Sequence, residues 1–291
     1  MRLKCPVCPH ACELAPGDVG RCRARIHMIR DAKGRIASLN YGVITSLALD
    51  PVEKKPLARF YPGSYILSVG SFGCNLACPF CQNHDISMKG ADDFAVAEPF
   101  TEADNHLTPD ELTRLAVNTV NRGNIGVAFT YNEPLIGYEY VLDTAKLLRN
   151  EGLKTVLVTN GCVNEGVARK VLPFTDALNI DLKSFDPDIY SRTLGGDLET
   201  VKRFISMANE QCHVELTTLI VPGMNDTKDE IKRIACWIAS LPDGDEIPLH
   251  ITRFFPRYRM TDREPTDVKL IYELTDTASE YLKYVYPGNV P

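Results

Sequence analysis

The amino-acid sequence predicts an α/β fold in which a mostly parallel sheet follows a small amino-terminal domain. From residue 65 onward, short apolar runs alternate with longer amphipathic segments. Such alternation implies parallel strands joined by right-handed helical crossovers, in a doubly wound sheet or in a full or partial barrel. The first 64 residues lack this alternation and hold four of the ten cysteines. We therefore expect a cysteine-rich domain over residues 1–64 and an α/β domain over residues 65–291.

The amino-terminal domain is expected to contain little regular structure. Its first 25 residues are rich in Cys, Pro, Gly and Arg and have too few large apolar side chains for a core of their own. Residues 26–30 and 35–41 are predicted to pair as a hairpin around the turn-forming segment 31–34. Residues 50–56 are polar and flanked by proline, which is typical of a linker.

The α/β domain is expected to alternate between strands and helices along its whole length. Thr108 and Glu111 form a capping box with Pro109 at the first helical position, which marks a helix start. In each of the possible folds, loops at the carboxyl ends of the strands build the active site. The predicted strands are 65–72, 125–130, 155–159, 177–182, 214–221, 248–254 and a short 284–286, and the helical segments are 109–121, 135–151, 165–172, 187–211, 227–241 and 266–282.

Composition restricts the class of protein and its surroundings. Hydrophobic residues make up 44% and charged residues 24% of the chain, as in ordinary globular proteins. The net charge of −6 gives no electrostatic reason to expect a nucleic-acid or membrane partner. Residues 1–6 lack the apolar stretch of a signal peptide, so we expect a cytoplasmic protein. In that reducing compartment, cysteines are more often metal ligands than disulfide partners.

Cys74, Cys78 and Cys81 have the spacing C-x3-C-x2-C directly after the first strand of the α/β domain. Thiolates suit iron–sulfur clusters, and a [4Fe–4S] cube usually takes one thiolate per iron. Three cysteines leave one iron open to chelation by the amino and carboxylate groups of S-adenosylmethionine (SAM). The alternative is a zinc site completed by a ligand such as His84, although zinc sites usually show two paired half-motifs.

This spacing, with the aromatic Phe80 before the last cysteine, resembles the radical SAM superfamily. More narrowly, the chain is similar to the activating-enzyme-like branch that includes the radical SAM enzyme of the AmmeMemoRadiSam system and is related to the activases of pyruvate formate-lyase. The resemblance implies a partial (β/α)6 TIM-like barrel with a small cysteine-rich, metal-binding domain before it. It runs over nearly the whole chain, through segments 5–12, 50–57, 130–134, 158–161, 179–183, 222–226 and 284–289.

Polar residues at the predicted strand ends are the candidates for binding the cofactor. The resemblance places Asn132 and Glu133, next to Thr130, at the ammonium group of SAM, while helix capping by Asn132 is the structural alternative. For Asp181 and Lys183, which share one face of a strand, the alternative is an internal ion pair. A histidine such as His250 is often only a hydrogen-bonded structural residue. The resemblance implies cofactor contacts for the remaining strand-end candidates as well: Phe80, Thr159, Asn160, Asp181, Lys183, His250 and Arg253.

The amino-terminal cysteines form a second candidate metal site. Cys5, Cys8, Cys12 and Cys22 follow C-x2-C-x3-C-x9-C, and four thiolates would close a site with no open position. Zinc and a second [4Fe–4S] cluster both fit, with a slight preference for iron–sulfur because the first three cysteines are compact; unligated thiols are the third alternative. The single cysteines 162, 212 and 236 are expected in or near the core, and the acidic segment 91–105 is expected to be a solvated loop or a lid over the cluster.

We expect an enzyme that takes an electron from a flavodoxin- or ferredoxin-like donor and cleaves SAM to a 5′-deoxyadenosyl radical. The radical would abstract hydrogen from a small molecule or macromolecule, or from a glycyl residue of a partner enzyme, as the activases do. An iron–sulfur electron carrier is the alternative of a different class. The polar strand-end residues, Asn132 and Glu133 among them, argue against a carrier, which needs no cofactor cradle.

Overall fold

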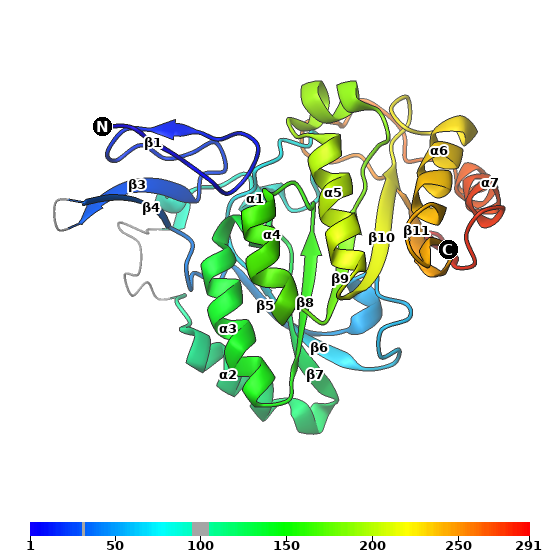
Figure 1. The fold of residues 1–291 in the computed structure, drawn as a ribbon. Coiled ribbons are helices and arrows are strands. Elements are labelled where there is room, and N and C mark those ends of the chain that lie inside the picture. The colour runs from blue at the N-terminus through cyan, green and yellow to red at the C-terminus, as the bar shows by residue number, and fades with distance from the viewer. Residues whose placement is uncertain (31–32, 95–104) are drawn as a thin grey trace.

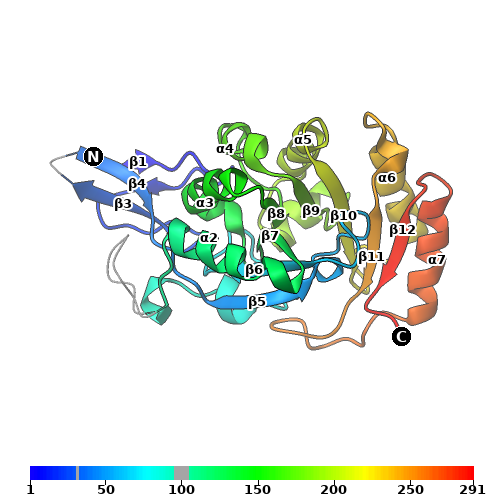
Figure 2. The same cartoon turned by 90° about the horizontal axis from the view of Figure 1, so that it is seen from below.

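A computed structural model describes residues 1–30, 33–94 and 105–291 of the chain. Its centre is a curved eight-stranded sheet whose first strand is antiparallel to the second and whose other strands are all parallel (Figures 1 and 2). The strands follow one another in chain order: β5 (Ser46–Pro51), β6 (Tyr65–Gly70), β7 (Asn124–Phe129), β8 (Lys154–Thr159), β9 (Ala177–Asp181), β10 (His213–Ile220), β11 (Leu249–Arg253) and β12 (Val285–Gly288).

The sheet does not close, because its edge strands β5 and β12 do not pair with each other. The predicted α/β fold with a partial barrel is therefore confirmed, and β12 adds a further parallel strand to it. Six helices cover the outside of the sheet (Figure 1): α2 (Pro109–Asn118), α3 (Tyr138–Asn150), α4 (Glu165–Val171), α5 (Leu198–Asn209), α6 (Lys228–Ala239) and α7 (Val268–Ser279). Within the described ranges, no helix is long and apolar enough to cross a membrane.

Local sequence signals explain where the helices begin and which side they bury. The Thr108 side chain accepts from the backbone N–H of Glu111, whose carboxylate accepts from the Thr108 N–H, so the predicted capping box is present. Leu112 and Ala116, one turn apart, lie fully buried against the sheet.

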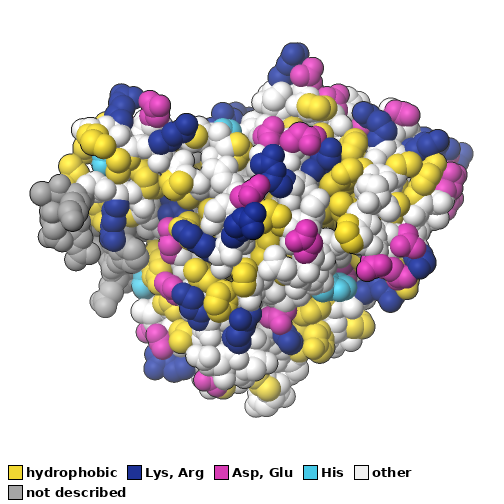
Figure 3. Space-filling model, in the orientation of Figure 1, with side chains coloured by type: hydrophobic (Ala, Val, Ile, Leu, Met, Phe, Trp, Pro, Cys, Tyr) yellow, Lys and Arg dark blue, Asp and Glu magenta, His cyan; other side chains and the backbone are white. Residues whose placement is uncertain are grey.

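The face drawn in Figure 3 carries basic and acidic side chains close together rather than in patches of one sign.

The amino-terminal segment lies at the side of the barrel near α3 (Figures 1 and 2). It contains two small two-stranded sheets, β1 (Leu3–Lys4) with β2 (Glu13–Leu14) and β3 (Arg25–Arg30) with β4 (Lys33–Ser38). The buried Arg25 guanidinium makes two hydrogen bonds of 2.7 Å to the Glu139 carboxylate on α3, which fixes this segment to the barrel. The division of the chain at residue 64 stays a prediction.

The segment predicted to be a linker is instead part of the barrel. Its residues from 50 onward end β5 and enter a short 3-10 helix, Val52–Lys54. Val52 and Leu57 are fully buried in an apolar cluster with Ile66, at the end of the barrel where the parallel strands begin. Of the acidic segment 91–105, residues 95–104 lie outside the described ranges, as do residues 31–32 of the predicted hairpin turn.

Candidate functional site

The candidate site is a cavity of about 440 Å³ inside the open barrel. It reaches from the loop after β6 to the connection between β5 and β6. Such a volume is typical of a site for a cofactor and a small molecule. Most of the residues predicted at the site line this cavity together: Cys74, Cys78, Cys81, Phe80, Thr130, Asn132, Glu133, Thr159, Asn160, Asp181 and Lys183.

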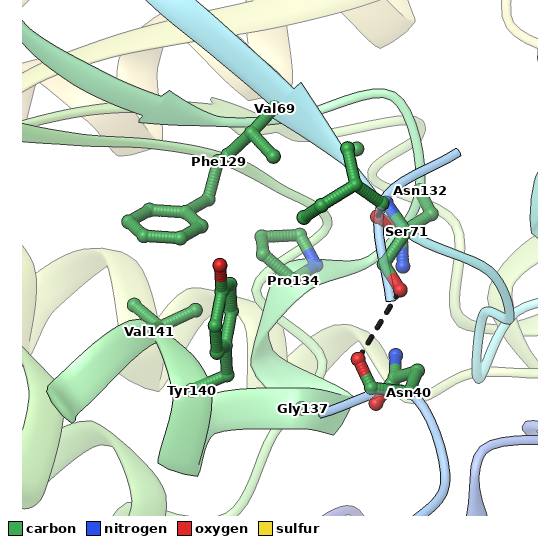
Figure 4. A pocket seen from close by; sticks show the side chains of 11 residues that line it. Asn40, Val69, Ser71, Phe129, Asn132, Pro134, Gly137, Tyr140 and Val141 are labelled. Atoms are coloured by element: carbon green, nitrogen blue, oxygen red, sulfur yellow. Dashed lines mark hydrogen bonds between the residues drawn. The ribbon is translucent and has the colours of Figure 1, made fainter. Parts of the chain in front are cut away.

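A second hollow lies behind this cavity, between β6 and α3, and is far smaller. Figure 4 shows the Phe129 and Tyr140 rings facing it, with Ser71 hydrogen-bonded to Asn40 at its other side. Its volume of about 30 Å³ leaves room for about one water molecule. Of these two hollows, the larger cavity is the one with room for an organic cofactor.

The cysteine loop begins where β6 ends. Gly73 has a φ of +86°, and a Cβ there would lie 2.6 Å from the Cys22 carbonyl oxygen, so glycine is required for the chain to turn into the loop. The Cys74 sulfur accepts from the backbone N–H of Leu76 at 3.4 Å and from the Asn160 amide at 3.6 Å. The Cys81 sulfur lies 3.1 Å from the Ser87 hydroxyl. These donors are suited to stabilising thiolates at the cavity wall.

Burial favours the protonated thiols of Cys74 and Cys78 over their thiolates. It raises the pKa of Cys78 to about 11 and also raises the pKa of Cys74. A bound cluster would stabilise the thiolates and offset this cost of burial. Among the described residues, no three Cys, His, Asp or Glu side chains are arranged to hold a single metal ion. A [4Fe–4S] cube is larger than one ion, and three thiols lining one cavity fit it as donors.

His84 does not complete a zinc site with these cysteines. Its Nδ1 lies 3.3 Å from the Cys81 carbonyl oxygen and its Nε2 lies 3.2 Å from the Asp85 carboxylate. Its ring also stacks on Tyr258, with ring centroids 4.7 Å apart. Both ring nitrogens therefore have other partners, and His84 is not among the residues that line the cavity.

Glu133 is the centre of a buried hydrogen-bond network at the strand ends. Its carboxylate accepts from the Thr159 hydroxyl at 2.7 Å, from the Asn160 N–H at 2.8 Å and from the Leu135 N–H at 2.9 Å. Burial nevertheless raises its pKa to about 7. A cation at this position would favour the ionised carboxylate, so an ammonium group fits the site.

Asn132 fixes the loop in place instead of capping a helix. Its amide oxygen accepts from the Ser71 N–H at 3.0 Å, and its amide nitrogen donates to the carbonyls of Phe72 and Gly73. The cap of the following 3-10 helix is Glu133, which accepts from the Leu135 N–H. Asn132 therefore connects the end of β7 to the cysteine loop, and it also lines the cavity.

Asp181 and Lys183, at the end of β9, form the ion pair that was the alternative interpretation. The Lys183 ammonium lies 2.9 Å from an Asp181 carboxylate oxygen. Burial alone would lower the pKa of Lys183, but the charge of Asp181 and its hydrogen bond to the ammonium group outweigh burial and raise this pKa. Both side chains line the cavity, so the pair presents its charges to whatever binds there.

His250 and Arg253 are not brought to the cavity. His250 lies near the start of β11, where its Nε2 is 2.7 Å from a Glu215 carboxylate oxygen and its ring stacks on Tyr286. Arg253 donates to the Thr266 carbonyl and lies over the Phe255 ring. The family resemblance suggested cofactor contacts for both, but His250 lies near the start of β11, and Arg253, at its carboxyl end, is engaged by Thr266 and Phe255 instead.

Glu215 lies near the start of β10, and its ionisation makes the free energy of unfolding depend on pH. Burial opposes its ionisation, but hydrogen bonds from His213 and His250 and from two backbone N–H groups, those of Ala58 and Arg59, lower its pKa to about 2. The folded state thus binds this proton less readily than the unfolded state, whose pKa is near 4.5. The stabilisation is full above the unfolded pKa and is lost as pH falls toward 2.

Glu215→Gln should therefore flatten the acid side of the stability curve. Urea unfolding at a series of pH values should show the natural protein losing about 3 kcal/mol more than the variant between about pH 5 and about pH 2. Parallel curves for the two proteins would contradict this assignment.

The sequence missed a polar cluster at the far end of the cavity. Lys55 is 3% exposed and lies 2.9 Å from an Asp50 carboxylate oxygen, which also accepts from the Tyr131 hydroxyl at 3.0 Å. The Lys55 ammonium lies 4.9 Å from the centroid of the Tyr131 ring. A doublet of lysines beside an acidic residue was the available signal, but the flanking prolines suggested a linker.

The amino-terminal cysteines pack directly against the cysteine loop. Cys5, Cys8 and Cys22 are buried, and the Cys5 N–H donates to the Cys12 carbonyl at 2.9 Å. His10 reaches the Asn75 carbonyl within the cysteine loop at 2.9 Å.

Of the single cysteines, Cys162 is buried and Cys212 half-buried, as predicted; Cys236 is exposed on α6, so its predicted place in or near the core is wrong. A cysteine is usually buried, and residue type alone does not show that Cys236 lies on the solvent-facing side of its helix.

Comparison with known proteins agrees with this geometry. Residues 68–238 match the family model of the radical SAM superfamily. Over its whole length the chain is 37% identical to an uncharacterised protein of Methanocaldococcus jannaschii, of which it covers 82%. It is 26% identical to the pyruvate formate-lyase-activating enzyme of Clostridium pasteurianum, over 70% of this chain and 80% of that one. The pyruvate formate-lyase 1-activating enzyme of Escherichia coli K12 is 25% identical over 61% of this chain and 70% of its own.

Solved structures share the fold at low sequence identity. Streptococcus suis SuiB bound to S-adenosylmethionine superposes with a TM-score of 0.55 and 13% identity, over 77% of this chain and 52% of that one. A point mutant of spore photoproduct lyase gives a TM-score of 0.52 and 11% identity, over 84% of this chain and 80% of that one. These likenesses support the partial-barrel fold.

Proposed function

Because the chain belongs to the radical SAM superfamily, within its activating-enzyme-like branch, we propose that it cleaves SAM reductively and uses the resulting radical to abstract hydrogen from a substrate. The observation that carries the proposal is one cavity lined by three cysteines and, beside them, by a buried carboxylate. Cys74, Cys78 and Cys81 would hold a [4Fe–4S] cluster. When bound and reduced, such a cluster supplies one electron that breaks the sulfonium C–S bond of SAM, giving methionine and a 5′-deoxyadenosyl radical.

The residues of the chain bind and orient the cofactor. Glu133, at the end of β7, is the partner proposed for the ammonium group of SAM. Thr159 and Asn160 hold that carboxylate in place, and Asn160 also donates to the Cys74 sulfur. The network thereby connects the SAM-binding carboxylate to the cysteine loop through one short set of hydrogen bonds. Asp181 and Lys183, which face the same cavity, are proposed to contact SAM or the substrate.

The test is anaerobic incubation of the iron-loaded protein with dithionite and SAM. Formation of 5′-deoxyadenosine, measured by chromatography, supports the proposal, and protein loaded with zinc is the matched control. A fully loaded cluster that forms no 5′-deoxyadenosine would overturn it in favour of an electron carrier. The carrier is the weaker candidate because it has no use for the cradle around Glu133.

The substrate proposed is a small molecule or a macromolecule other than a glycyl-radical enzyme. The second candidate is a glycyl residue of a partner enzyme, favoured by the similarity to proteins named as activating enzymes. Spin trapping and electron paramagnetic resonance on a candidate partner distinguish the two. A glycyl radical formed only in the presence of this protein and SAM would favour the second candidate.

We further propose that Cys5, Cys8, Cys12 and Cys22 hold a second metal centre, a [4Fe–4S] cluster in preference to zinc. The contact of His10 with the Asn75 carbonyl places this segment beside the cysteine loop, where an electron from a flavodoxin- or ferredoxin-like donor could enter. Four thiolates leave no open iron, which suits electron transfer rather than SAM binding.

A double variant, Cys5→Ala/Cys8→Ala, tests this second centre. Anaerobic reconstitution should give about eight irons per natural chain and about four in the variant, because each cube holds four. Zinc bound in place of the lost iron would instead identify a structural zinc site. Equal iron content in both proteins would contradict a metal at these cysteines.

A further inference from the structure

The far end of the cavity is built by residues from the connection between β5 and β6. This connection enters the barrel, and the Pro56 carbonyl accepts from the Asn179 side chain on β9 at 2.8 Å. The Asn179 oxygen in turn accepts from the Thr217 hydroxyl on β10 at 2.9 Å. We call Asp50, Lys55, Tyr131, Asn179 and Thr217 the barrel floor.

The Asp50–Lys55 pair of the barrel floor lies toward the opposite end of the cavity from the cysteine loop, and the Tyr131 side chain reaches Asp50 from the carboxyl end of β7. In the antiparallel ladder, Asp50 pairs with Ile66 near the start of β6, whereas the cysteine loop follows Gly70 at its end. Lys55 and Cys74 nevertheless line the same cavity. A molecule on the floor therefore shares the cavity with anything bound at the cysteines.

Lys55 has unused hydrogen-bonding capacity at the floor. An ammonium group carries three donors. Among the described residues, the Asp50 carboxylate is the one acceptor hydrogen-bonded to it, and the Tyr131 ring covers another side. Leaving the donors of a buried ammonium unpaired costs free energy, so a further acceptor in the cavity would be bound favourably.

Charges are separated along the cavity. At the floor, Lys54 and Lys55 share a single carboxylate, that of Asp50, which is also engaged by the Tyr131 hydroxyl. Two ammonium groups against one carboxylate make this end positive. At the other end, Glu133 is placed to pair with the ammonium group of SAM.

From this arrangement we infer that the barrel floor binds an anionic group, a carboxylate or a phosphate, of a small-molecule substrate, with the Lys55 ammonium as its direct partner. The inference rests on the proposed function, because the substrate is defined as the molecule bound beside SAM. A peptide glycyl group has no net charge to satisfy this ammonium. The same cavity must also hold SAM, so the space over the floor suits a small molecule.

Anion binding to the reconstituted holoenzyme, with its cluster oxidised and SAM bound, tests the inference. Isothermal titration with inorganic phosphate and, separately, with succinate should show saturable binding of at least one anion at millimolar concentration. The anion that binds more tightly identifies the chemical class. Lys55→Met should weaken that binding about tenfold or more, because a hydrogen bond to a charged group is lost.

Two further variants serve as controls for the effect of Lys55→Met on anion binding. Lys154→Met removes a half-buried lysine that pairs with Asp176 outside the cavity, and it should leave anion binding within about twofold of the natural protein. Lys55→Met alone leaves the Asp50 carboxylate with the exposed Lys54 and the Tyr131 hydroxyl but without its buried cation, which could unfold the protein. Asp50→Asn/Lys55→Met removes both charges and keeps an acceptor for Tyr131, and it should show the same loss as the single variant.

The outcomes separate this inference from the proposed function. Natural protein that forms 5′-deoxyadenosine but binds neither anion overturns the anion site alone. Anion binding that persists unchanged in Asp50→Asn/Lys55→Met also overturns it. Anion binding lost in the Lys55 variants, in a protein that never cleaves SAM, supports the site and overturns the proposed function.

Discussion

Alanine in place of Cys78 is expected to reduce 5′-deoxyadenosine formation to the rate seen without enzyme. Two thiolates cannot hold a cube that leaves one iron open for SAM, so the cluster is lost or fails to bind the cofactor. The measurement is the rate of 5′-deoxyadenosine formation under dithionite, together with the iron content of the reconstituted protein.

Cys236→Ala provides the matched control. Cys236 is exposed on α6 and does not line the cavity, so its loss should leave rate and iron content unchanged. Full activity in the Cys78→Ala variant would contradict the assignment of the three cysteines.

Replacing Glu133 by alanine is expected to have the second largest effect, on stability as well as on SAM binding. The change leaves three buried donors without an acceptor: the Thr159 hydroxyl and the N–H groups of Leu135 and Asn160. At about 1–3 kcal/mol for each buried unpaired group, the free energy of unfolding should fall by several kcal/mol. Urea unfolding of the metal-free protein measures this term without the cofactor.

The conservative variant Glu133→Gln separates the structural role from the binding role. Glutamine keeps an oxygen for part of the network but has no charge for an ammonium group, so it should weaken SAM binding more than it lowers stability. Glu165→Ala, at an exposed surface pair, should change stability by less than about 0.5 kcal/mol. Natural SAM affinity in both Glu133 variants would remove Glu133 from the cofactor site.

Much of the fold was predictable because local signals agreed with the tertiary arrangement. The capping box at Thr108 and the apolar runs of β6 to β11 mark elements whose side chains are buried as the pattern requires. The cavity residues next to strand ends were also predictable, since parallel strands bring their carboxyl ends to one edge. Asn132 and Glu133 follow β7, and Asn160 follows β8.

The remaining features depend on contacts between distant parts of the chain. Nothing local shows that Lys55 meets Tyr131, because 76 positions separate them in the numbering and the pairings of β5 with β6 and of β6 with β7 bring them together. His250 is a polar strand residue like Asp181, but its partner is Glu215 at the other end of the barrel. Exposure of Cys236 likewise depends on the face of α6 that packs on the sheet.

The central claim is that Cys74, Cys78 and Cys81 hold a cube with one iron free to bind SAM. Electron–nuclear double resonance on the reduced protein, with SAM labelled by ¹⁵N in its amino group, tests this most directly. In the Cys5→Ala/Cys8→Ala variant, so that a single cluster is observed, we expect a ¹⁵N hyperfine coupling to the cluster signal. A reduced cluster whose spectrum is unchanged by labelled SAM, or tetrahedral zinc at these three cysteines, would contradict the claim.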